Sequence, residues 1–352
     1  MASIVDLLVH MRRAKGSDLH LAAGLEPRIR ASGHLEVVPG WPVLDDKAIR
    51  GLLREIADDQ QWAEYERTGD IDFTYGLEGV ARFRSNFFRQ EKGAGAVFRL
   101  VPEKIIPLED LKLPPVIGKF ADIEQGLVLV TGPTGSGKST TMAAILDRIN
   151  ATRAKHIVTI EDPVEFVHQN KMSVFSHREV GNHTKAFGPA LRAAVRQDAD
   201  IIVVGEMRDL ETIALAIGAA EMGAVVFGTL HTNSAPKTID RLIDAFPADQ
   251  QPQVRTTLSE SLAGVVAQQL VPNASGEGRT AVNEILLKTP GLPNLIREGK
   301  TQMIQSLMQA GRGLGMQLMD DALMKLVQEK RVLAKDAYMK ANNKSLFERL
   351  LA

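Results

Sequence analysis

The feature that most constrains the fold of this chain is the run Gly132-Pro133-Thr134-Gly135-Ser136-Gly137-Lys138-Ser139-Thr140. It fits the phosphate-binding P-loop pattern G-x-x-x-x-G-K-[ST]. Residues 126–131 before it are typical of a buried strand, and residues 140–146 are typical of the first turns of a helix. This order places an anion at a helix N-terminus, where backbone N–H groups and the helix dipole favour negative charge. We therefore expect the whole run to bind a nucleotide, with Lys138 at the β- and γ-phosphates and the Ser139 hydroxyl on Mg²⁺.

The composition limits the classes of protein to which the chain can belong. A length of 352 residues suggests two or three domains, and 44% apolar residues are enough for sizeable cores. A net charge of −1 lacks the basic excess of a dedicated nucleic-acid binder, so we expect no nucleic-acid partner. The chain has no cysteine, which excludes disulfides and fits a reducing cytoplasm.

No segment of the sequence has the pattern of a signal peptide or a membrane span. The longest apolar region, 213–230, contains Glu221 and three glycines. We therefore expect no direct membrane insertion, and any membrane role would depend on protein partners.

Alternating and helical patterns predict a small α+β domain over residues 1–101. We expect a helix at 4–15, strands at 17–21 and 27–31, a charged amphipathic helical region at 45–66, and strands at 71–75, 80–88 and 94–100, with a hairpin turn at 76–79. Four prolines and little periodicity then predict a linker at 102–116.

An α/β pattern extends over residues 117–352. Short β-branched runs at 156–160, 201–204 and 224–229 alternate with helical segments, which predicts a parallel sheet with helices on both faces. From about residue 292 onward the pattern predicts a helical bundle that ends in a polar, basic helix.

Acidic residues follow two of these predicted strands. Glu161 and Asp162 follow the strand at 156–160, and Glu206 follows the strand at 201–204, after Gly205. A nucleotide hydrolase needs carboxylates to hold Mg²⁺ and to orient the attacking water, and in open α/β sheets such groups lie at the carboxyl ends of strands. We take Glu161 as the candidate for polarising water and Glu206 as an acid that reaches the metal through a water. The alternative is that Glu161 and Asp162 only cap a strand or helix.

His231 follows the strand at 224–229, so we expect it beside the P-loop. A lone histidine is often only structural. Its place at this strand end favours a second interpretation, in which it senses the γ-phosphate or a neighbouring subunit.

Arginines on one face of the first domain are a further candidate. Alternation places Arg82, Arg84 and Asn86 on one face of a strand and apolar residues on the other, and Arg99 lies on the next strand. This is either a solvated sheet face or a set of arginine fingers, since a guanidinium group matches phosphate oxygens bidentately.

Four segments together resemble the PilT-type ATPases of the type II/IV secretion ATPase superfamily. They are the run 132–140 and the segments 160–165, 204–212 and 228–233, which correspond to the Walker A, Asp, Walker B and His boxes of that family. Gly205-Glu206 is the family's usual form of Walker B. The resemblance covers nearly the whole chain, and shorter matches lie at 17–21, 82–84, 178–181, 246–250 and 315–320.

The resemblance implies a RecA-like ATPase domain preceded by a PAS-like domain, with ATP between them. It also implies a homohexameric ring motor that hydrolyses ATP to power type IV pilus retraction and twitching motility. Such a motor is cytoplasmic and peripheral at the inner-membrane base of the pilus, where a platform protein is its partner. The implied roles are the catalytic glutamate for Glu161, the Walker B acid for Glu206, the His-box residue for His231, and arginine candidates for Arg82, Arg84 and Arg99.

Two positions depart from the family pattern. Pro293 stands where an arginine is common in the retraction-associated segment, and His177 stands where a glutamine usually precedes residues 178–181. Pro293 keeps open an accessory retraction paralogue with weak or altered activity, or a nucleotide-sensing scaffold. A pilus extension or type II secretion ATPase is a further possibility, although such a protein usually has a longer N-terminal region and a four-cysteine zinc site. A RecA-like nucleic-acid translocase is a possibility from a different functional class.

Overall fold

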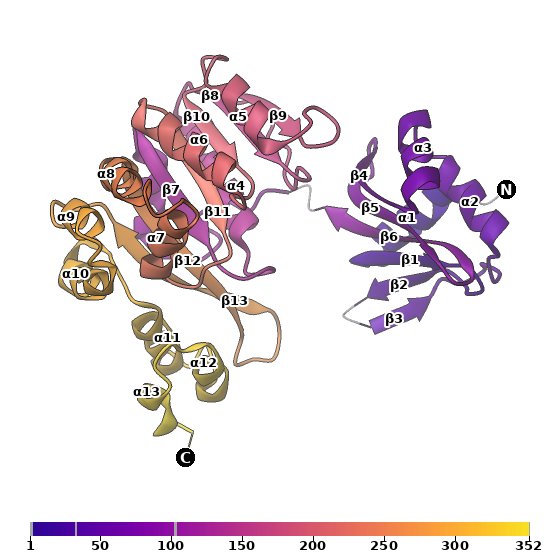
Figure 1. Ribbon diagram of the computed structural model, residues 1–352. Coiled ribbons are helices and arrows are strands. Elements are labelled where there is room, and N and C mark those ends of the chain that lie inside the picture. The colour runs from indigo at the N-terminus through magenta and orange to yellow at the C-terminus, as the bar shows by residue number, and fades with distance from the viewer. Residues whose placement is uncertain (1–2, 32–33, 102–103, 352) are drawn as a thin grey trace. The chain divides into compact units, whose positions relative to one another are not determined.

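The structure is a computed structural model that describes residues 3–31, 34–101 and 104–351. The chain forms two compact units (Figure 1), of which the first comprises Met1–Lys104 and Pro163–Val167 and the second comprises Ile105–Asp162 and His168–Ala352. The start of the predicted linker, residues 102 and 103, lies outside the described residues.

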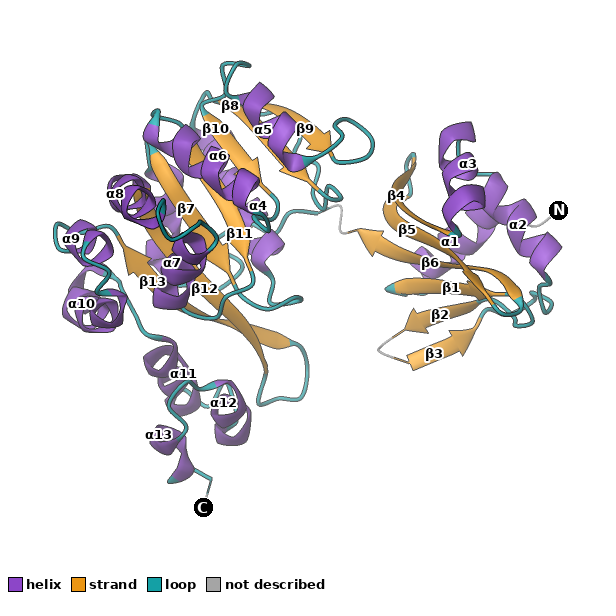
Figure 2. Ribbon diagram, viewed as in Figure 1, coloured by secondary structure: helices purple, strands orange, loops and turns teal. Residues whose placement is uncertain are grey.

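The first unit is built on a six-stranded antiparallel sheet with the strand order β3-β2-β1-β6-β5-β4. Its elements are α1 (Ile4–Arg13), β1 (Asp18–Ala22), β2 (Arg28–Ala31), β3 (His34–Val37), α2 (Asp46–Arg54), α3 (Asp59–Thr68), β4 (Asp70–Leu77), β5 (Ala81–Gln90) and β6 (Gly93–Val101). The helices pack on one face of this sheet (Figure 2), over a core that includes Leu8, Phe83, Phe87 and Phe98. The other face is therefore left to polar side chains.

The predicted helical region at 45–66 consists of two helices, α2 and α3. The Asp58 side chain accepts a hydrogen bond from Gln61 N at 2.8 Å, and the Gln61 side chain accepts one from Asp58 N at 3.1 Å. This reciprocal capping box satisfies N–H groups that have no partner within a helix, so a new helix begins at Asp59.

The second unit is built on a seven-stranded sheet with the strand order β13-β12-β7-β11-β10-β8-β9. The strands are β7 (Gly126–Thr131), β8 (His156–Glu161), β9 (Val174–Glu179), β10 (Ile201–Val204), β11 (Val225–Leu230), β12 (Leu262–Pro272) and β13 (Arg279–Leu287). All neighbours are parallel except β12 and β13, which form an antiparallel pair at one edge. The predicted parallel sheet is present, but the edge pair was not predicted from the sequence.

Helices cover both faces of this sheet (Figures 1 and 2). They are the 3-10 helix η1 (Pro115–Asp122), α4 (Lys138–Thr152), α5 (Phe187–Ala194), α6 (Leu210–Glu221), α7 (Ala235–Asp244) and α8 (Gln251–Ser261). Leu127 and Leu129 of β7 pack into the core beside α5 to α8, and Val128 and Val130 pack into the core beneath α4. A strand buried on both faces explains why β7 is apolar throughout.

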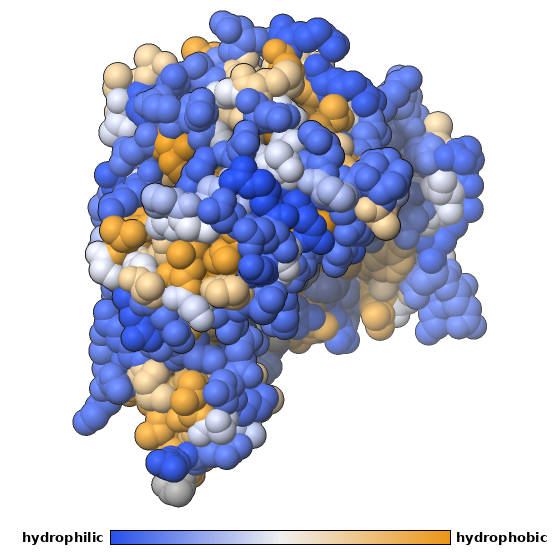
Figure 3. All heavy atoms as spheres, turned by 60° about the vertical axis from the view of Figure 1, so that its left-hand side comes forward, coloured by the Kyte–Doolittle hydropathy of each residue, from blue (hydrophilic) through white to orange (hydrophobic). Residues whose placement is uncertain are grey.

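The C-terminal helices divide between two cores. They are α9 (Leu292–Arg297), η2 (Thr301–Met303), α10 (Ile304–Ala310), η3 (Gly311–Leu314), α11 (Met319–Gln328), α12 (Ala334–Lys340) and α13 (Ser345–Glu348). Helices α9 and α10 add to the core beside α8, whereas α11 to α13 form a small separate core with Val271 and Val282. Met339 on α12 and Leu346 on α13 are exposed. Figure 3 shows apolar side chains at the surface of the C-terminal end. Among the described residues, no helix has both the length and the apolar character needed to cross a membrane.

Candidate active site

Four neighbouring strands carry the candidate residues of the second unit at their carboxyl ends. Main-chain hydrogen bonds join these ends: Gly132 N donates to Leu230 O at 3.2 Å, Met207 N to Thr229 O at 3.0 Å, and Gly205 N to Ile160 O at 2.8 Å. Along one edge of the sheet the order is therefore P-loop, His231, Glu206 and Glu161. The structure brings these sequence-predicted candidates together.

The P-loop conformation depends on its glycines. Gly132, Gly135 and Gly137 have φ values of 144°, 75° and 83°, a region that other residues rarely adopt. A Cβ atom on Gly132 would also lie 2.1 Å from the main-chain oxygen of Gln268. Helix α4 begins at Lys138, and Gly137 before it has no side chain to cap the first turn. The first N–H groups of α4 are thus available to an anion.

The side chain of Lys138 extends back to the beginning of the P-loop. Its Nζ atom donates hydrogen bonds to Gly132 O at 2.8 Å and to Pro133 O at 3.2 Å. The ammonium group is therefore held over the loop, where its charge favours a bound phosphate.

Glu206 is hydrogen-bonded to two basic groups. Its Oε1 atom lies 2.7 Å from His231 Nε2 and 2.6 Å from Arg208 Nε. Burial by itself raises the pKa of Glu206, but the Arg208 hydrogen bond and the His231 charge outweigh it and hold the pKa below its usual range. Glu206 is thus a carboxylate that stays ionised at neutral pH, and His231 is its direct partner.

Glu161 is the last residue of β8 and is half-buried. Gly205, the residue after β10, lies against it: a Cβ atom there would be 3.1 Å from Glu161 Cα and 3.2 Å from Ile160 O. An aspartate at this position would press on the main chain that carries Glu161. Glycine therefore allows the two acidic strand ends to approach closely.

A buried polar cluster beneath the P-loop was missed in the sequence. The side chain of Gln268 on β12 hydrogen-bonds Ser136 O at 2.7 Å and Thr141 Oγ1 at 2.8 Å. In the sequence, Gln268 lies within an apolar run with no motif, so only the pairing of β12 with β7 reveals its contact with the P-loop.

The arginine candidates belong to the first unit. The predicted alternation is present, since Ala81, Phe83 and Phe87 enter the core while Arg84 is exposed. Arg84 pairs with Arg99 across β5 and β6. Each also has an acidic partner: Arg99 Nε lies 2.8 Å from Asp18 Oδ1, and Arg84 Nε lies 3.6 Å from Asp72 Oδ1. The participation of Arg82, Arg84 and Arg99 in a nucleotide site stays a prediction.

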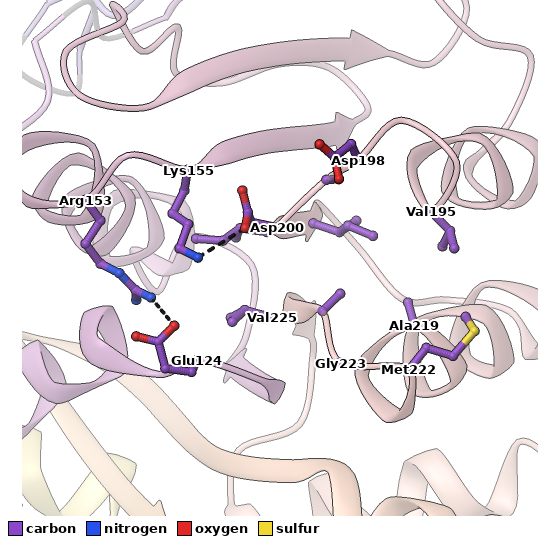
Figure 4. Close-up of a pocket in the computed structure, with 14 residues that line it drawn as sticks. Glu124, Arg153, Lys155, Val195, Asp198, Asp200, Ala219, Met222, Gly223 and Val225 are labelled. Atoms are coloured by element: carbon purple, nitrogen blue, oxygen red, sulfur yellow. Dashed lines mark hydrogen bonds and ion pairs between the residues drawn. The ribbon is translucent and has the colours of Figure 1, made fainter.

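A pocket of about 280 Å³ lies at the opposite edge of the sheet, at the amino ends of β10 and β11 (Figure 4). Its charged residues pair with one another: Arg153 Nη2 lies 2.6 Å from Glu124 Oε2, and Lys155 Nζ lies 3.1 Å from Asp200 Oδ1. None of the sequence-predicted candidates lines this pocket.

A parallel sheet with a P-loop and two acidic strand ends at one edge defines a nucleotide-binding P-loop ATPase. Residues 78–349 match the family described as "Type II/IV secretion system protein". The chain belongs to this family, and it is an ATPase.

The chain is 49% identical over 338 residues to "Type IV pilus retractation ATPase PilT" of Pseudomonas aeruginosa, which covers 96% of this chain and 98% of that protein. It is 46% identical over 317 residues to "Twitching motility protein" of Neisseria gonorrhoeae, covering 90% and 84%. The structure entitled "Crystal Structure of the Pilus Retraction Motor PilT and Bound ADP" superposes with a TM-score of 0.93 at 41% identity, covering 99% of this chain and all of the other. The fold predicted from the sequence, a PAS-like α+β unit before a RecA-like unit, is thereby confirmed.

Proposed function

We propose that this chain is a motor ATPase that powers type IV pilus retraction and, through it, twitching motility. The observation that carries the proposal is the extent of the likeness to a retraction ATPase, which leaves almost no part of either chain unmatched. A motor needs the first unit as well as the second unit, which carries the nucleotide site, so a match over both units supports more than ATP hydrolysis alone.

In this proposal residues 132–140 hold the triphosphate of ATP. Ser139 follows Lys138 in the first turn of α4, and Glu206 is an ionised carboxylate, so the two supply the oxygen ligands that Mg²⁺ prefers, Glu206 through a water. A bound Mg²⁺ would neutralise charge that develops on the phosphates. Glu161 orients the attacking water, and His231 positions Glu206 through their hydrogen bond.

Arginines complete the proposed site. Arg82, Arg84 and Arg99 would meet the charge that develops on the γ-phosphate, because guanidinium groups bind phosphate oxygens bidentately. Partial exposure of Arg84 and Arg99 supports this role, since their acidic partners leave N–H groups at the surface.

We also propose that the chain works as a homohexameric ring in the cytoplasm, at the inner-membrane base of the pilus. The pilus platform protein would be its partner there. Apolar side chains exposed on α12 and α13, such as Met339 and Leu346, support contact with other chains, because apolar groups gathered on a surface often mark such contacts.

A second candidate, an accessory retraction ATPase, is favoured by Pro293. This residue is the second of α9, where a missing N–H costs nothing because no intrahelical partner exists for it. The helix therefore forms, but the arginine common at this position is absent from a surface that still presents Arg255 and Arg297. A contact that depends on that charge would be weaker in this chain.

A deletion strain tests the proposal. A primary retraction motor predicts that pili remain while twitching is lost, and that the wild-type gene but not the Lys138→Ala variant restores twitching. Twitching that persists at a reduced level, and that Pro293→Arg increases, would indicate the accessory ATPase. Loss of pili would contradict both and indicate an extension ATPase. If the purified chain shows no turnover in a steady-state ATPase assay, all the motor functions are excluded and a nucleotide-sensing scaffold is the remaining function.

A further inference from the structure

Gln268 lies directly beneath the P-loop. Strand β12 pairs with β7 as far as Ala267 and Thr131, so Gln268 is the next residue along and faces the start of the P-loop. Its main-chain oxygen would be 2.1 Å from a Cβ atom on Gly132, and its Nε2 atom would be 3.0 Å from a Cβ atom on Gly137. Gln268 is 1% exposed. It therefore fills the space that these two glycines leave at either end of the loop.

The amide of Gln268 joins the P-loop to the helix that follows it. Its Nε2 atom donates to Ser136 O at 2.7 Å, and its Oε1 atom accepts from Thr141 Oγ1 at 2.8 Å. A P-loop binds phosphate by directing N–H groups at the anion, which requires its carbonyl oxygens to point elsewhere. A Ser136 carbonyl held by Gln268 satisfies this requirement before any nucleotide arrives.

The orientation of this amide is itself fixed by the edge hairpin. Asn283, the partner of Gln268 across β12 and β13, donates from Nδ2 to Gln268 Oε1 at 2.9 Å. Gln317, just before α11, donates from Nε2 to Asn283 O at 2.7 Å. Oε1 thus receives two hydrogen bonds, which leaves only Nε2 to face Ser136. Because the hairpin and the segment before α11 hold Gln268, the phosphate site depends on residues far along the chain.

We propose that Gln268 is a positioning residue for nucleotide binding, which holds the P-loop in its phosphate-binding conformation through Ser136 and Thr141. The proposal rests on the proposed role of residues 132–140 in binding ATP. It adds that this conformation is maintained from the β12–β13 hairpin and not by the loop alone.

The test compares Gln268→Met with Gln269→Met. Methionine is close to glutamine in length but has no amide group, so it keeps packing and removes the hydrogen bonds. Gln269 is also buried on β12, and its side chain instead contacts Lys340 O at 3.4 Å. For Gln268→Met we expect the Kd and KM for ATP to rise at least about 10-fold because a buried carbonyl loses its donor, with kcat close to wild type. The Tm without nucleotide should fall as well, because the groups that lose their partners are buried. Gln269→Met should bind ATP as wild type does.

Wild-type ATP affinity in folded Gln268→Met would overturn the proposal, and so would equal weakening in both variants or a loss confined to kcat. If Gln268→Met does not fold, Thr141→Val is measured in the same way. It removes one hydrogen bond from the Gln268 amide and should raise the Kd by a smaller factor of about 3 to 10, and no change would overturn the proposal. Absence of ATP binding in the wild-type protein would instead contradict the proposed function.

Discussion

The carboxyl ends of the parallel strands in the second unit form one edge of the sheet, the carboxyl edge, and their amino ends form the opposite one, the amino edge. The two differ in how their charged side chains are used. At the amino edge Asp200 and Arg153 each have several protein partners. Asp200 accepts from His156 N at 2.9 Å and Lys155 Nζ at 3.1 Å, and Arg153 donates to Glu124 and to two main-chain oxygens. At the carboxyl edge the P-loop N–H groups precede an uncapped helix, and Glu206 lies among basic groups.

The comparison teaches that a charged pocket alone does not identify a functional site. The amino-edge pocket contains two ion pairs, yet these pairs only join the segment before β8 to Glu124, after η1, and to Asp200, before β10 (Figure 4). The carboxyl edge instead combines an anion-binding loop with carboxylates. Matched substitutions at the two edges can therefore separate chemistry from stability.

The largest difference is expected between Lys138→Ala and Lys155→Ala. Lys138 is held over the P-loop, and loss of about two charge-assisted hydrogen bonds to phosphate should weaken ATP binding at least about 100-fold. The control Lys155→Ala, at the amino edge, should leave ATP affinity unchanged. Titration calorimetry with ATP measures both, and normal affinity in Lys138→Ala would overturn the P-loop assignment.

Next in size is the effect of Glu161→Gln on turnover. A neutral amide cannot orient and deprotonate water as a carboxylate does, so we expect kcat to fall by about 100-fold or more while the Kd for ATP changes little. Glu124→Gln at the amino edge is the matched control and should hydrolyse ATP normally. Phosphate-release kinetics decide the matter: near wild-type turnover in Glu161→Gln would remove this residue from the mechanism.

How far the sequence predicts this site depends on the range of the interactions. The P-loop and the strand ends at Glu161, Glu206 and His231 are local patterns, and a parallel sheet aligns such ends at one edge whatever the rest of the chain does. These candidates were therefore found without the structure. The role of Gly205 could not be predicted from the sequence, because its contact with Glu161 joins two different strand ends.

The edge hairpin could not be predicted in the same way. Strand β12 is an apolar run whose local pattern does not distinguish a strand from a buried helix, and its register depends on pairing with β7, far away in the sequence. The local sequence around Gln268 and Asn283 therefore does not indicate that the two side chains meet beneath the P-loop. The break at Asp58, by contrast, has a local cause, because the capping box that begins α3 is formed by residues three apart in the sequence.

A smaller effect is expected for His231→Ala. Removing this partner of Glu206 should lower kcat by about 10-fold, the value of one hydrogen bond to a charged group. Because Arg208 and His231 together hold the Glu206 pKa down against burial, the variant should lose activity at a higher pH than wild type as the solution is acidified. His156→Ala at the amino edge should show no such shift in its pH–rate profile. A profile in His231→Ala identical to that of wild type would contradict the pairing.

The smallest effect is expected for Asp200→Asn, which should change stability and not activity. Burial by itself raises the pKa of Asp200, but the His156 N–H and Lys155 hold it below the usual range. A carboxylate whose pKa is lower in the folded chain stabilises it above the unfolded pKa, and this contribution is lost as pH falls through the folded pKa. The pair is partly exposed, so the loss at about pH 7 should not exceed roughly 1 kcal/mol. Thermal unfolding at about pH 7 and about pH 3 should show the Tm difference shrinking in acid. A fall in kcat at unchanged Tm would instead place the amino edge within the catalytic machinery.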